Sequence, residues 1–159
     1  MINFENKICA RADFAARASA LPRPLVFTNG CFDVLHRGHV TYLAQARNLG
    51  ASLIVGVNSD ASVKHLGKGD DRPLNSQEYR MAVLAALQAV DMLVLFDENT
   101  PLALILACHP DVLVKGGDWP SEKIVGAYEV LGWGGKVHSI PFLHQRSTTA
   151  LLNKIRNNS

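Results

Sequence analysis

The chain alternates short, continuously apolar runs with segments of helical periodicity, and this alternation restricts its fold more than any other feature. Strands that are covered on both faces are apolar throughout, whereas strands with one wet face alternate apolar and polar residues. Helical segments are predicted at 38–49, 76–89, 101–107, 123–131 and 148–156, with a further N-terminal helix near 3–20. Between them the fully apolar pattern predicts five strands, at 25–28, 52–58, 92–96, 112–115 and 137–140.

Terminator and capping residues support this segmentation. Gly50 follows the 38–49 segment as a helix stop, Asn75 and Glu78 predict a capping box, and Pro101 follows the cap candidate Thr100. Because crossovers between parallel strands are right-handed, the alternation predicts an α/β, Rossmann-like, doubly wound parallel five-stranded sheet. Ligands of such sheets bind outside the carboxyl ends of the strands. The polar segment 64–75 is predicted to be a mobile loop at that edge.

Composition excludes several classes of protein. A chain of 159 residues, 48% of them hydrophobic, can bury one substantial core. A net charge of +2 without a dense basic stripe argues against nucleic acid as a partner and favours a small anion. The sequence has no long uncharged apolar run and no signal-peptide pattern, which predicts a soluble, cytoplasmic protein without membrane association. Cys9, Cys31 and Cys108 are odd in number and scattered, which favours reduced thiols, with the first and last as packing residues.

The stretch "NGCFDVLHRGH", residues 29–39, carries the strongest chemical signal. It lies where the first predicted strand gives way to a helix, so His36 and His39 fall on one face of the first helical turn. Unpaired N–H groups and the helix dipole favour an anion there, and two imidazoles add donors, which predicts a phosphate site. A single histidine in such a place is more often a cap or a packing residue. The sequence contains neither GxxxxGK[ST] nor GxGxxG, so two other phosphate-binding loops are excluded.

"GCFDVLHRGH" resembles the signature of the nucleotidyltransferases whose histidine motif is H-x-G-H, here residues 36–39. Five further segments follow the order found in one family of these enzymes, the adenylyltransferases that make ADP-heptose: "NSDASVKHL", "RPLN", "RMAVLAAL", "DVLVKGGDW" and "RSTTALL". The resemblance runs from about residue 23 to residue 156. It therefore implies a nucleotidyltransferase domain at 23–159, preceded by an N-terminal helical extension at 1–22.

The resemblance implies adenylyl transfer from ATP to a sugar 1-phosphate, D-glycero-β-D-manno-heptose 1-phosphate, giving pyrophosphate and ADP-heptose for lipopolysaccharide core synthesis. The attacking phosphate oxygen is already anionic near neutral pH, so the site must position two polyanions and neutralise charge rather than supply a general base. Mg²⁺ would be held mainly by ATP phosphates and water, without a metal site built from protein side chains. A homodimer or higher homo-oligomer stays open. The 159 residues leave no room for a sugar kinase, so a separate kinase is the expected functional partner.

The resemblance also implies roles for individual residues. Catalysis is assigned to three side chains, His36, His39 and Lys64, with His39 as the stronger contributor. Substrate binding is assigned to Asp33, Lys64 and Arg72. Nucleotide binding is assigned to the two histidines and to residues at strand ends and at the start of the last helix: Thr28, Asn29, Gly30, Cys31, Phe32, Gly116, Asp118, Ser147, Thr148 and Thr149.

Several of these assignments have a structural alternative. Asp33 is equally consistent with a helix-entry cap, and the hydroxyls of 147–149 are consistent with capping alone. Lys68 is interpreted as a solvated loop cation, and Arg72 allows the same interpretation. Gly30 and the glycines of "VKGGDW" are interpreted as permitting close approach of a ligand, and Trp119 as a packing lid. The remaining histidines, at 65, 109, 138 and 144, lack metal-ligand spacing and are interpreted as surface or loop residues.

Two other functions stay open. The first is a different adenylyl- or cytidylyltransferase of the same fold that acts on a non-heptose phosphate. Related glycerol phosphate cytidylyltransferases carry "RTEGISTT" before their last helix, whereas this chain has "FLHQRSTT", which weakens a cytidylyltransferase interpretation. A non-catalytic nucleotide sensor is the second alternative, and the presence of two phosphate-binding segments argues against it. Pyrophosphate release, measured with several nucleoside triphosphates and sugar or polyol phosphates, would separate the three functions.

Overall fold

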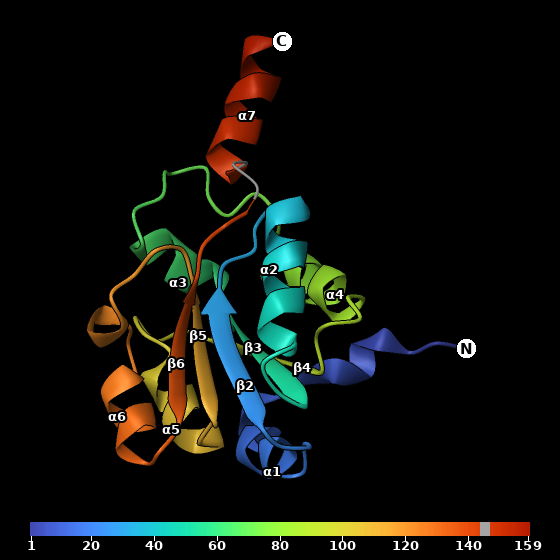
Figure 1. Ribbon diagram of the computed structural model, residues 1–159. Helices are drawn as coiled ribbons and strands as arrows, with labels where there is room; N and C mark the ends of the chain where they lie inside the picture. Colours follow the sequence, from blue (N-terminus) through green and yellow to red (C-terminus); the bar gives the residue numbers. More distant parts are fainter. Residues whose placement is uncertain (144–146) are drawn as a thin grey trace.

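Six parallel strands form the centre of the computed structural model, which describes residues 1–143 and 147–159 (Figure 1). The strands lie side by side in the order β1-β4-β3-β2-β5-β6, and every recorded pairing is parallel. The predicted α/β fold is therefore confirmed. His144, which the sequence analysis interprets as a surface or loop residue, lies outside the described residues. The strands are β1 (Ile8–Cys9), β2 (Leu25–Gly30), β3 (Ser52–Asn58), β4 (Met92–Phe96), β5 (Val112–Gly116) and β6 (Lys136–Ile140).

Helices cover both faces of the sheet, and one more helix stands away from it (Figure 1). Core side chains place α1, α5 and α6 on one face and α2 and α4 on the other. The α-helices are α1 (Phe14–Ser19), α2 (Arg37–Arg47), α3 (Asp60–His65), α4 (Gln77–Ala85), α5 (Leu102–Cys108), α6 (Ala127–Gly132) and α7 (Thr148–Asn157). Three 3₁₀ turns complete the described secondary structure: η1 (Phe4–Lys7), η2 (Arg11–Asp13) and η3 (Ser121–Lys123).

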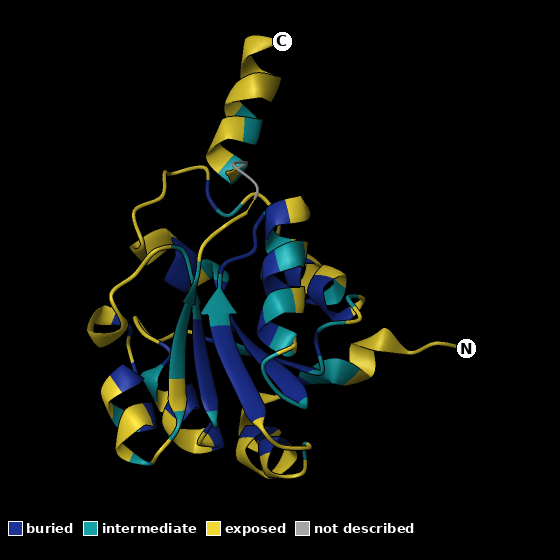
Figure 2. Ribbon diagram, in the orientation of Figure 1, coloured by how far each residue is buried: buried dark blue, intermediate teal, exposed yellow. Residues whose placement is uncertain are grey.

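The central strands are apolar on both faces because each face packs against a layer of helices. Successive residues point to opposite faces of a strand, so Val26 joins the core beneath α2 and α4 while Phe27 joins the core beneath α1 and α5. Figure 2 shows these strands almost wholly buried and α7 almost wholly exposed. The continuous apolar runs in the sequence therefore reflect burial on two sides.

The prediction of five strands was wrong, because the N-terminal segment adds a sixth. Ile8 and Cys9 pair with Leu93 and Val94 of β4, although two residues are too few to show a period in the sequence. The helix expected near 3–20 is limited to two 3₁₀ turns and the short α1. Phe14 of this segment is 1% exposed, so the first 22 residues contribute to the core of the sheet.

Local structure also departs from prediction around the polar segment 64–75. A short helix, α3, includes its first two residues, and the Ser59 hydroxyl caps this helix by accepting from the Ser62 N–H at 3.1 Å. The predicted capping box is absent: α4 begins after Ser76 without a side-chain cap. The Asn75 amide donates instead to the Asp33 carbonyl at 2.5 Å. A tertiary contact thus outcompetes the local cap.

The strand order creates a crevice at the carboxyl edge of the sheet. β2 pairs with β3 on one side and with β5 on the other, so the connections from these neighbouring strands leave in opposite directions. Such a switch point is where open α/β sheets bind ligands, because no crossover covers the gap. The "NGCFDVLHRGH" stretch begins with the last two residues of β2 and enters this crevice.

Candidate active site

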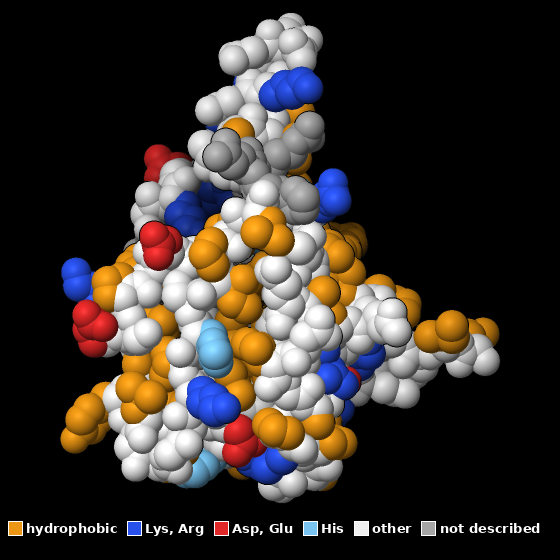
Figure 3. Space-filling view, viewed as in Figure 1, with side chains coloured by type: hydrophobic (Ala, Val, Ile, Leu, Met, Phe, Trp, Pro, Cys, Tyr) orange, Lys and Arg blue, Asp and Glu red, His pale blue; other side chains and the backbone are white. Residues whose placement is uncertain are grey.

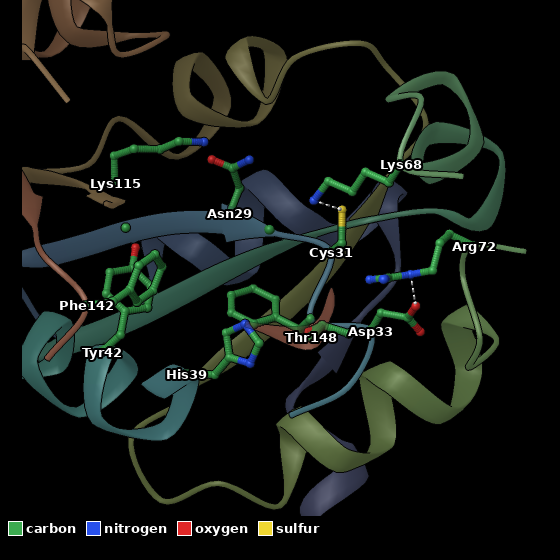
Figure 4. Close-up of a pocket in the computed structure, with 13 residues that line it drawn as sticks. Asn29, Cys31, Asp33, His39, Tyr42, Lys68, Arg72, Lys115, Phe142 and Thr148 are labelled. Carbon is green, nitrogen blue, oxygen red and sulfur yellow. Dashed lines mark hydrogen bonds and ion pairs between the residues drawn. The ribbon is translucent and has the colours of Figure 1, made fainter. Parts of the chain in front are cut away.

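A cavity of about 170 Å³ occupies the crevice (Figure 4). Its walls come from the carboxyl end of β2 with the turn and α2 that follow it, the loop after α3, the carboxyl end of β5, and the C-terminal part of the chain, through Phe142 after β6 and Thr148 in α7. Segments from four parts of the chain therefore meet at the predicted edge. The residues that line it are Asn29, Gly30, Cys31, Phe32, Asp33, His39, Tyr42, Lys68, Arg72, Lys115, Gly116, Phe142 and Thr148.

The turn after β2 is shaped by an unusual backbone conformation. Phe32 has φ 50°, in the left-handed region that a bulky side chain seldom adopts, which suggests that surrounding contacts impose it. The Phe32 ring lies where a side chain on Gly30 would be, since a Cβ there would come within 2.9 Å of it. The glycine thus makes room for a ring of its own turn, whereas the sequence suggested room for a ligand.

Arg80 fixes this turn from beneath and was not singled out from the sequence. It is 2% exposed, and its guanidinium donates to the carbonyls of Cys31 at 2.7 Å and Asn58 at 2.8 Å. The same group pairs with Asp60 at 2.8 Å and donates to the Asn75 carbonyl at 3.1 Å. One buried side chain therefore ties together the ends of β2 and β3 and the starts of α3 and α4.

The two histidines of the motif have different environments. His36 is the N-cap of α2, and its Nδ1 accepts from the Gly38 N–H at 3.1 Å. Its ring stacks on that of His39 with centroids 3.9 Å apart, and the His39 ring also meets Phe32 edge to face. Only His39 lines the cavity. The helix position thus gives one imidazole a capping role and directs the other toward the crevice.

Burial lowers the pKa of His39 to about 4, and the neighbouring His36 and Lys68 act in the same direction. The ring is therefore neutral at pH 7. Among the described residues, the Nδ1 atom of His39 has no hydrogen-bond partner. A buried polar atom without a partner costs free energy, which an incoming polar ligand would recover.

Three cations converge on the cavity from two segments: Lys68 and Arg72 from the loop after α3, and Lys115 from β5. Burial lowers the pKa of Lys115, and the charge of Lys68 lowers it further, while Cys31 has the opposite effect. The Lys68 ammonium also lies 3.7 Å from the Cys31 sulfur (Figure 4). Figure 3 shows Lys and Arg side chains recessed in a hollow below α7. Like charges gathered in a partly buried site favour an anionic ligand, because an anion relieves their repulsion.

Asp33 is the one carboxylate among the residues recorded as lining the cavity. It accepts from Arg72 Nε at 2.7 Å and from the backbone N–H groups of Leu74 and Asn75, each at 2.9 Å. It does not cap α2, because His36 holds that position. Of its two predicted roles, the helix-entry cap was therefore wrong.

The structure brings many of the predicted site residues into one cavity but leaves others outside. Lys64, Asp118 and Thr149 are exposed and do not line it. Thr28 lies below the floor, fully buried, with its hydroxyl bonded to that of Tyr42. Ser147 acts as the N-cap of α7, accepting from the Ala150 N–H at 3.0 Å. Thr148 does line the cavity, and its hydroxyl contacts the Val34 carbonyl at 3.4 Å.

Four lining residues were missed from the sequence: Tyr42, Lys68, Lys115 and Phe142. A signal for Lys115 existed, since it sits at the carboxyl end of a predicted strand, where such sheets bind ligands. The sequence gives no comparable signal for Lys68, because the geometry of a loop cannot be read from its composition. The rings of Tyr42 and Phe142 meet edge to face, with their centroids 5.8 Å apart. A Cβ on Gly116 would contact both rings.

A second cavity, of about 210 Å³, shares Asn29 and Lys115 with the first. Its other walls are largely apolar and include Trp119. The Lys115 ammonium lies 5.9 Å from the centre of the Trp119 ring, so this side chain stands between the two cavities. A ligand with phosphates and a flat or ring-shaped group would find a cationic part and an apolar part side by side.

Over residues 1–143 and 147–159, no group of three or more His, Cys, Asp or Glu side chains is arranged to hold a metal ion. Within the same ranges, no helix is both long and apolar enough to cross a membrane. All three cysteines are free and buried, and Cys9 and Cys108 pack in the core as predicted.

Fold, motif and cationic crevice together define a nucleotidyltransferase. The family model for cytidylyltransferase-like proteins matches residues 27–154, and the chain belongs to this family. Among curated proteins, it is 57% identical over 155 residues to the D-beta-D-heptose 1-phosphate adenylyltransferase of Bordetella bronchiseptica, covering 96% of both chains. It is also 56% identical over 141 residues to the bifunctional protein HldE of Pseudomonas fluorescens, covering 89% of this chain but 30% of that relative.

Solved structures agree on the fold. The lipopolysaccharide core biosynthesis protein of Thermoplasma volcanium superposes with a TM-score of 0.61 at 27% identity, over 77% of this chain and 98% of that one. The pantoate-beta-alanine ligase of Francisella tularensis gives a TM-score of 0.60 at 16% identity, over 89% of this chain and 68% of that one. The second likeness concerns the fold alone.

Proposed function

We propose that the protein transfers the adenylyl group of ATP to D-glycero-β-D-manno-heptose 1-phosphate, forming ADP-heptose and releasing pyrophosphate. The single observation that carries this proposal is the 57% identity, over 96% of both chains, to a protein named D-beta-D-heptose 1-phosphate adenylyltransferase. The geometry of the crevice supports the reaction class. The product is a precursor for the lipopolysaccharide core, in keeping with the name of the Thermoplasma volcanium structure.

In this reaction an oxygen of the sugar phosphate attacks the α-phosphorus of ATP, and the bond from that phosphorus to the bridging oxygen of pyrophosphate breaks. The attacking oxygen carries negative charge near neutral pH, so no side chain has to remove a proton. The protein must instead hold two polyanions within bonding distance against their mutual repulsion. The three cations of the crevice and the helix start at α2 meet this requirement.

His39 is suited to a role that strengthens during the reaction. Its pKa of about 4 keeps the ring neutral before a ligand arrives. A phosphate at the cavity would favour the imidazolium and raise that pKa, because opposite charges stabilise each other in a site of low dielectric. The ring would then donate to a phosphate oxygen as charge develops on it.

Mg²⁺ would reach the site on the triphosphate. The lining carboxylate, Asp33, is engaged by Arg72 and by two backbone N–H groups, so the described cavity offers the ion no unpaired carboxylate. We infer that phosphate oxygens and water hold the metal, whose contribution is to neutralise phosphate charge. The positions of Lys68, Arg72 and Lys115 complement this neutralisation.

ATP as the nucleotide donor favours a cytoplasmic location for the reaction. The sugar 1-phosphate is the class of product that a sugar kinase makes, and its supply by a separate kinase stays a prediction. The two adjoining cavities share Asn29 and Lys115, so the phosphates and a neighbouring ring can be bound together.

Product formation by the purified protein tests the proposal. ATP, Mg²⁺ and the heptose 1-phosphate should release pyrophosphate and give ADP-heptose, identified by mass. CTP in place of ATP, and glycerol 3-phosphate or glucose 1-phosphate in place of the heptose, should each be turned over far more slowly. Comparable rates with CTP and glycerol 3-phosphate would favour a cytidylyltransferase. Nucleotide binding without turnover of any pair would favour a sensor, and activity that survives a chelator would remove the Mg²⁺ claim.

A further inference from the structure

We infer that Asp33 is a positioning residue for the proposed reaction: it holds the segment 72–75 against the β2–α2 turn and directs the Arg72 guanidinium into the crevice. The inference rests on the proposed function for its activity readout. It assigns to Asp33 a role through another side chain, in place of the direct substrate binding that the sequence suggested.

The hydrogen-bonding capacity of Asp33 is taken up by protein groups. One carboxylate oxygen accepts from Arg72 Nε at 2.7 Å, and the backbone N–H groups of Leu74 and Asn75 donate to the carboxylate at 2.9 Å. The Asp33 backbone is bound as well, because its carbonyl accepts from the Asn75 amide at 2.5 Å. The Asp33 side chain is 1% exposed. A group so enclosed is poorly placed to reach a sugar.

One edge of the Arg72 guanidinium is bound by Asp33, and the other edge faces the cavity. Because Nε is engaged by Asp33, the two terminal nitrogens are left to point elsewhere, and Figure 4 shows them directed into the cavity. The planar guanidinium suits phosphate, which it can bind through two parallel N–H donors. Its side chain is 9% exposed, so without a partner for Nε the charge would be buried and misdirected.

Apart from the contacts with Asp33, the polar contact recorded between the loop that carries Arg72 and the turn, among the described residues, is that of the Lys68 ammonium with the Cys31 sulfur at 3.7 Å. Gly69 has φ 119° and the loop contains Pro73, so it has no regular secondary structure of its own. On its far side Arg80 donates to the Asn75 carbonyl at 3.1 Å. Asp33 and Arg80 thus hold the end of the loop between them, and the carboxylate sets the direction of Arg72.

A double-mutant cycle tests this role. Asp33→Asn, Arg72→Met and the double variant are compared in kcat/KM for the heptose 1-phosphate and for ATP. Each single variant should lose about 10- to 100-fold, the loss typical when a group that orients a functional side chain is removed. The double variant should lose no more than Arg72→Met alone, because Asp33 has nothing left to orient. If the loss in the double variant equalled the product of the two single losses, the inference would be overturned. A normal kcat/KM in Asp33→Asn would overturn it as well.

Asp91→Asn is the matched control, because Asp91 makes the same kinds of contact at the opposite edge of the sheet. It pairs with Arg47 Nε at 2.8 Å and accepts from the Leu53 N–H at 2.8 Å. This variant should lower the melting temperature and leave kcat/KM unchanged. If Asp33→Asn behaved in the same way, its role would be structural and the inference would fail.

Two further measurements keep the test independent of folding and of the proposed function. Arg72→Lys keeps the charge but lacks the planar group that can bind Asp33 through one nitrogen and a phosphate through the others. Its kcat/KM should therefore fall nearly as much as that of Arg72→Met. Full activity of this variant would contradict the orienting role of Asp33. Calorimetric affinities for ATP and for inorganic phosphate should show coupling between Asp33 and Arg72 with at least one probe. If ADP-heptose were not formed but this coupling appeared, only the proposed function would fail. Additive binding losses with both probes would overturn the positioning role.

Discussion

Two segments reach the same crevice from opposite parts of the chain, and they are attached to the domain very differently. The turn from Thr28 to His39 is held by buried contacts, including those of Arg80 and Asp33, and most of its residues are buried or half-buried. Helix α7 carries no fully buried residue and stands away from the sheet in Figure 1. Its recorded polar ties to the body, in the described chain, are the Thr148 contact with Val34 and the Arg156 ion pair with Asp71.

This difference in attachment predicts which segment can stabilise the transition state. A donor held rigidly in a buried turn needs no reorganisation when charge develops, so it contributes to kcat. A hydroxyl on an exposed helix can add a binding contact, but its position is less constrained and its effect should appear in KM. Four predictions test this contrast, from the largest expected effect to the smallest.

Replacing His39 by Asn should lower kcat by about 10²- to 10³-fold, the loss typical of one preorganised donor, while ATP affinity changes less. The measurement is steady-state kinetics of pyrophosphate release with binding by calorimetry. His36→Asn is the informative companion, because Asn is a good N-cap and should keep the start of α2 intact. A near-normal kcat in His39→Asn with a sharp fall in melting temperature would make His39 a structural residue and erase the contrast.

Removing the Lys68 charge should have the next largest effect, since its ammonium lies beside Cys31 of the buried turn. Hydrogen bonds to charged groups are worth about 1.5–3 kcal/mol, so Lys68→Ala should lower kcat/KM by roughly 10- to 100-fold. Lys136→Ala, at the start of β6 and remote from the crevice, serves as the control for loss of a lysine. If Lys64→Ala lowered kcat/KM more than Lys68→Ala, the catalytic and substrate-binding role that the sequence predicts for Lys64 would be supported instead.

Thr148→Ala should act on KM for ATP rather than on kcat. A neutral hydrogen bond contributes about 0.5–1.5 kcal/mol, which corresponds to roughly a 2- to 10-fold increase in KM. Thr149→Ala, on the same helix but with an exposed side chain outside the cavity, is the control. A kcat loss as large as that of His39→Asn would show that α7 also supports the transition state, which would break the comparison.

The smallest effect concerns stability and pH. His39 has a pKa of about 4 when folded and 6.5 ordinarily, so between these values the unfolded chain binds more protons than the native one. The free energy of unfolding therefore rises with pH through this window. The contribution of His39 to stability is lost as the pH falls from 6.5 toward 4. Chemical denaturation across the window should show a steeper loss in the wild type than in His39→Asn. Parallel curves would mean that burial does not disfavour the imidazolium.

The chemical part of the site was predictable because it is local in sequence. The "HRGH" motif places two imidazoles at the start of one helix through its local spacing, and Gly30, Cys31 and Phe32 lie at the end of a strand. Apolar runs such as 52–58 and 92–96 predicted strands because burial on both faces leaves a continuous pattern. The same reasoning failed at β1, where two residues carry no period.

Tertiary structure alone decided which charged groups reach the crevice and which groups Asp33 contacts. Lys64 and Lys68 lie four residues apart, yet only Lys68 lines the cavity, because α3 ends between them and the chain turns back. The Asn75 side chain donates to the Asp33 carbonyl instead of forming the predicted capping box. The Arg80 guanidinium donates to carbonyls that lie 49 and 22 residues away in sequence. Sequence by itself determined the class of fold, the phosphate motif and the reaction class. The direction of each long side chain depended on buried, long-range hydrogen bonds, which no local pattern encodes.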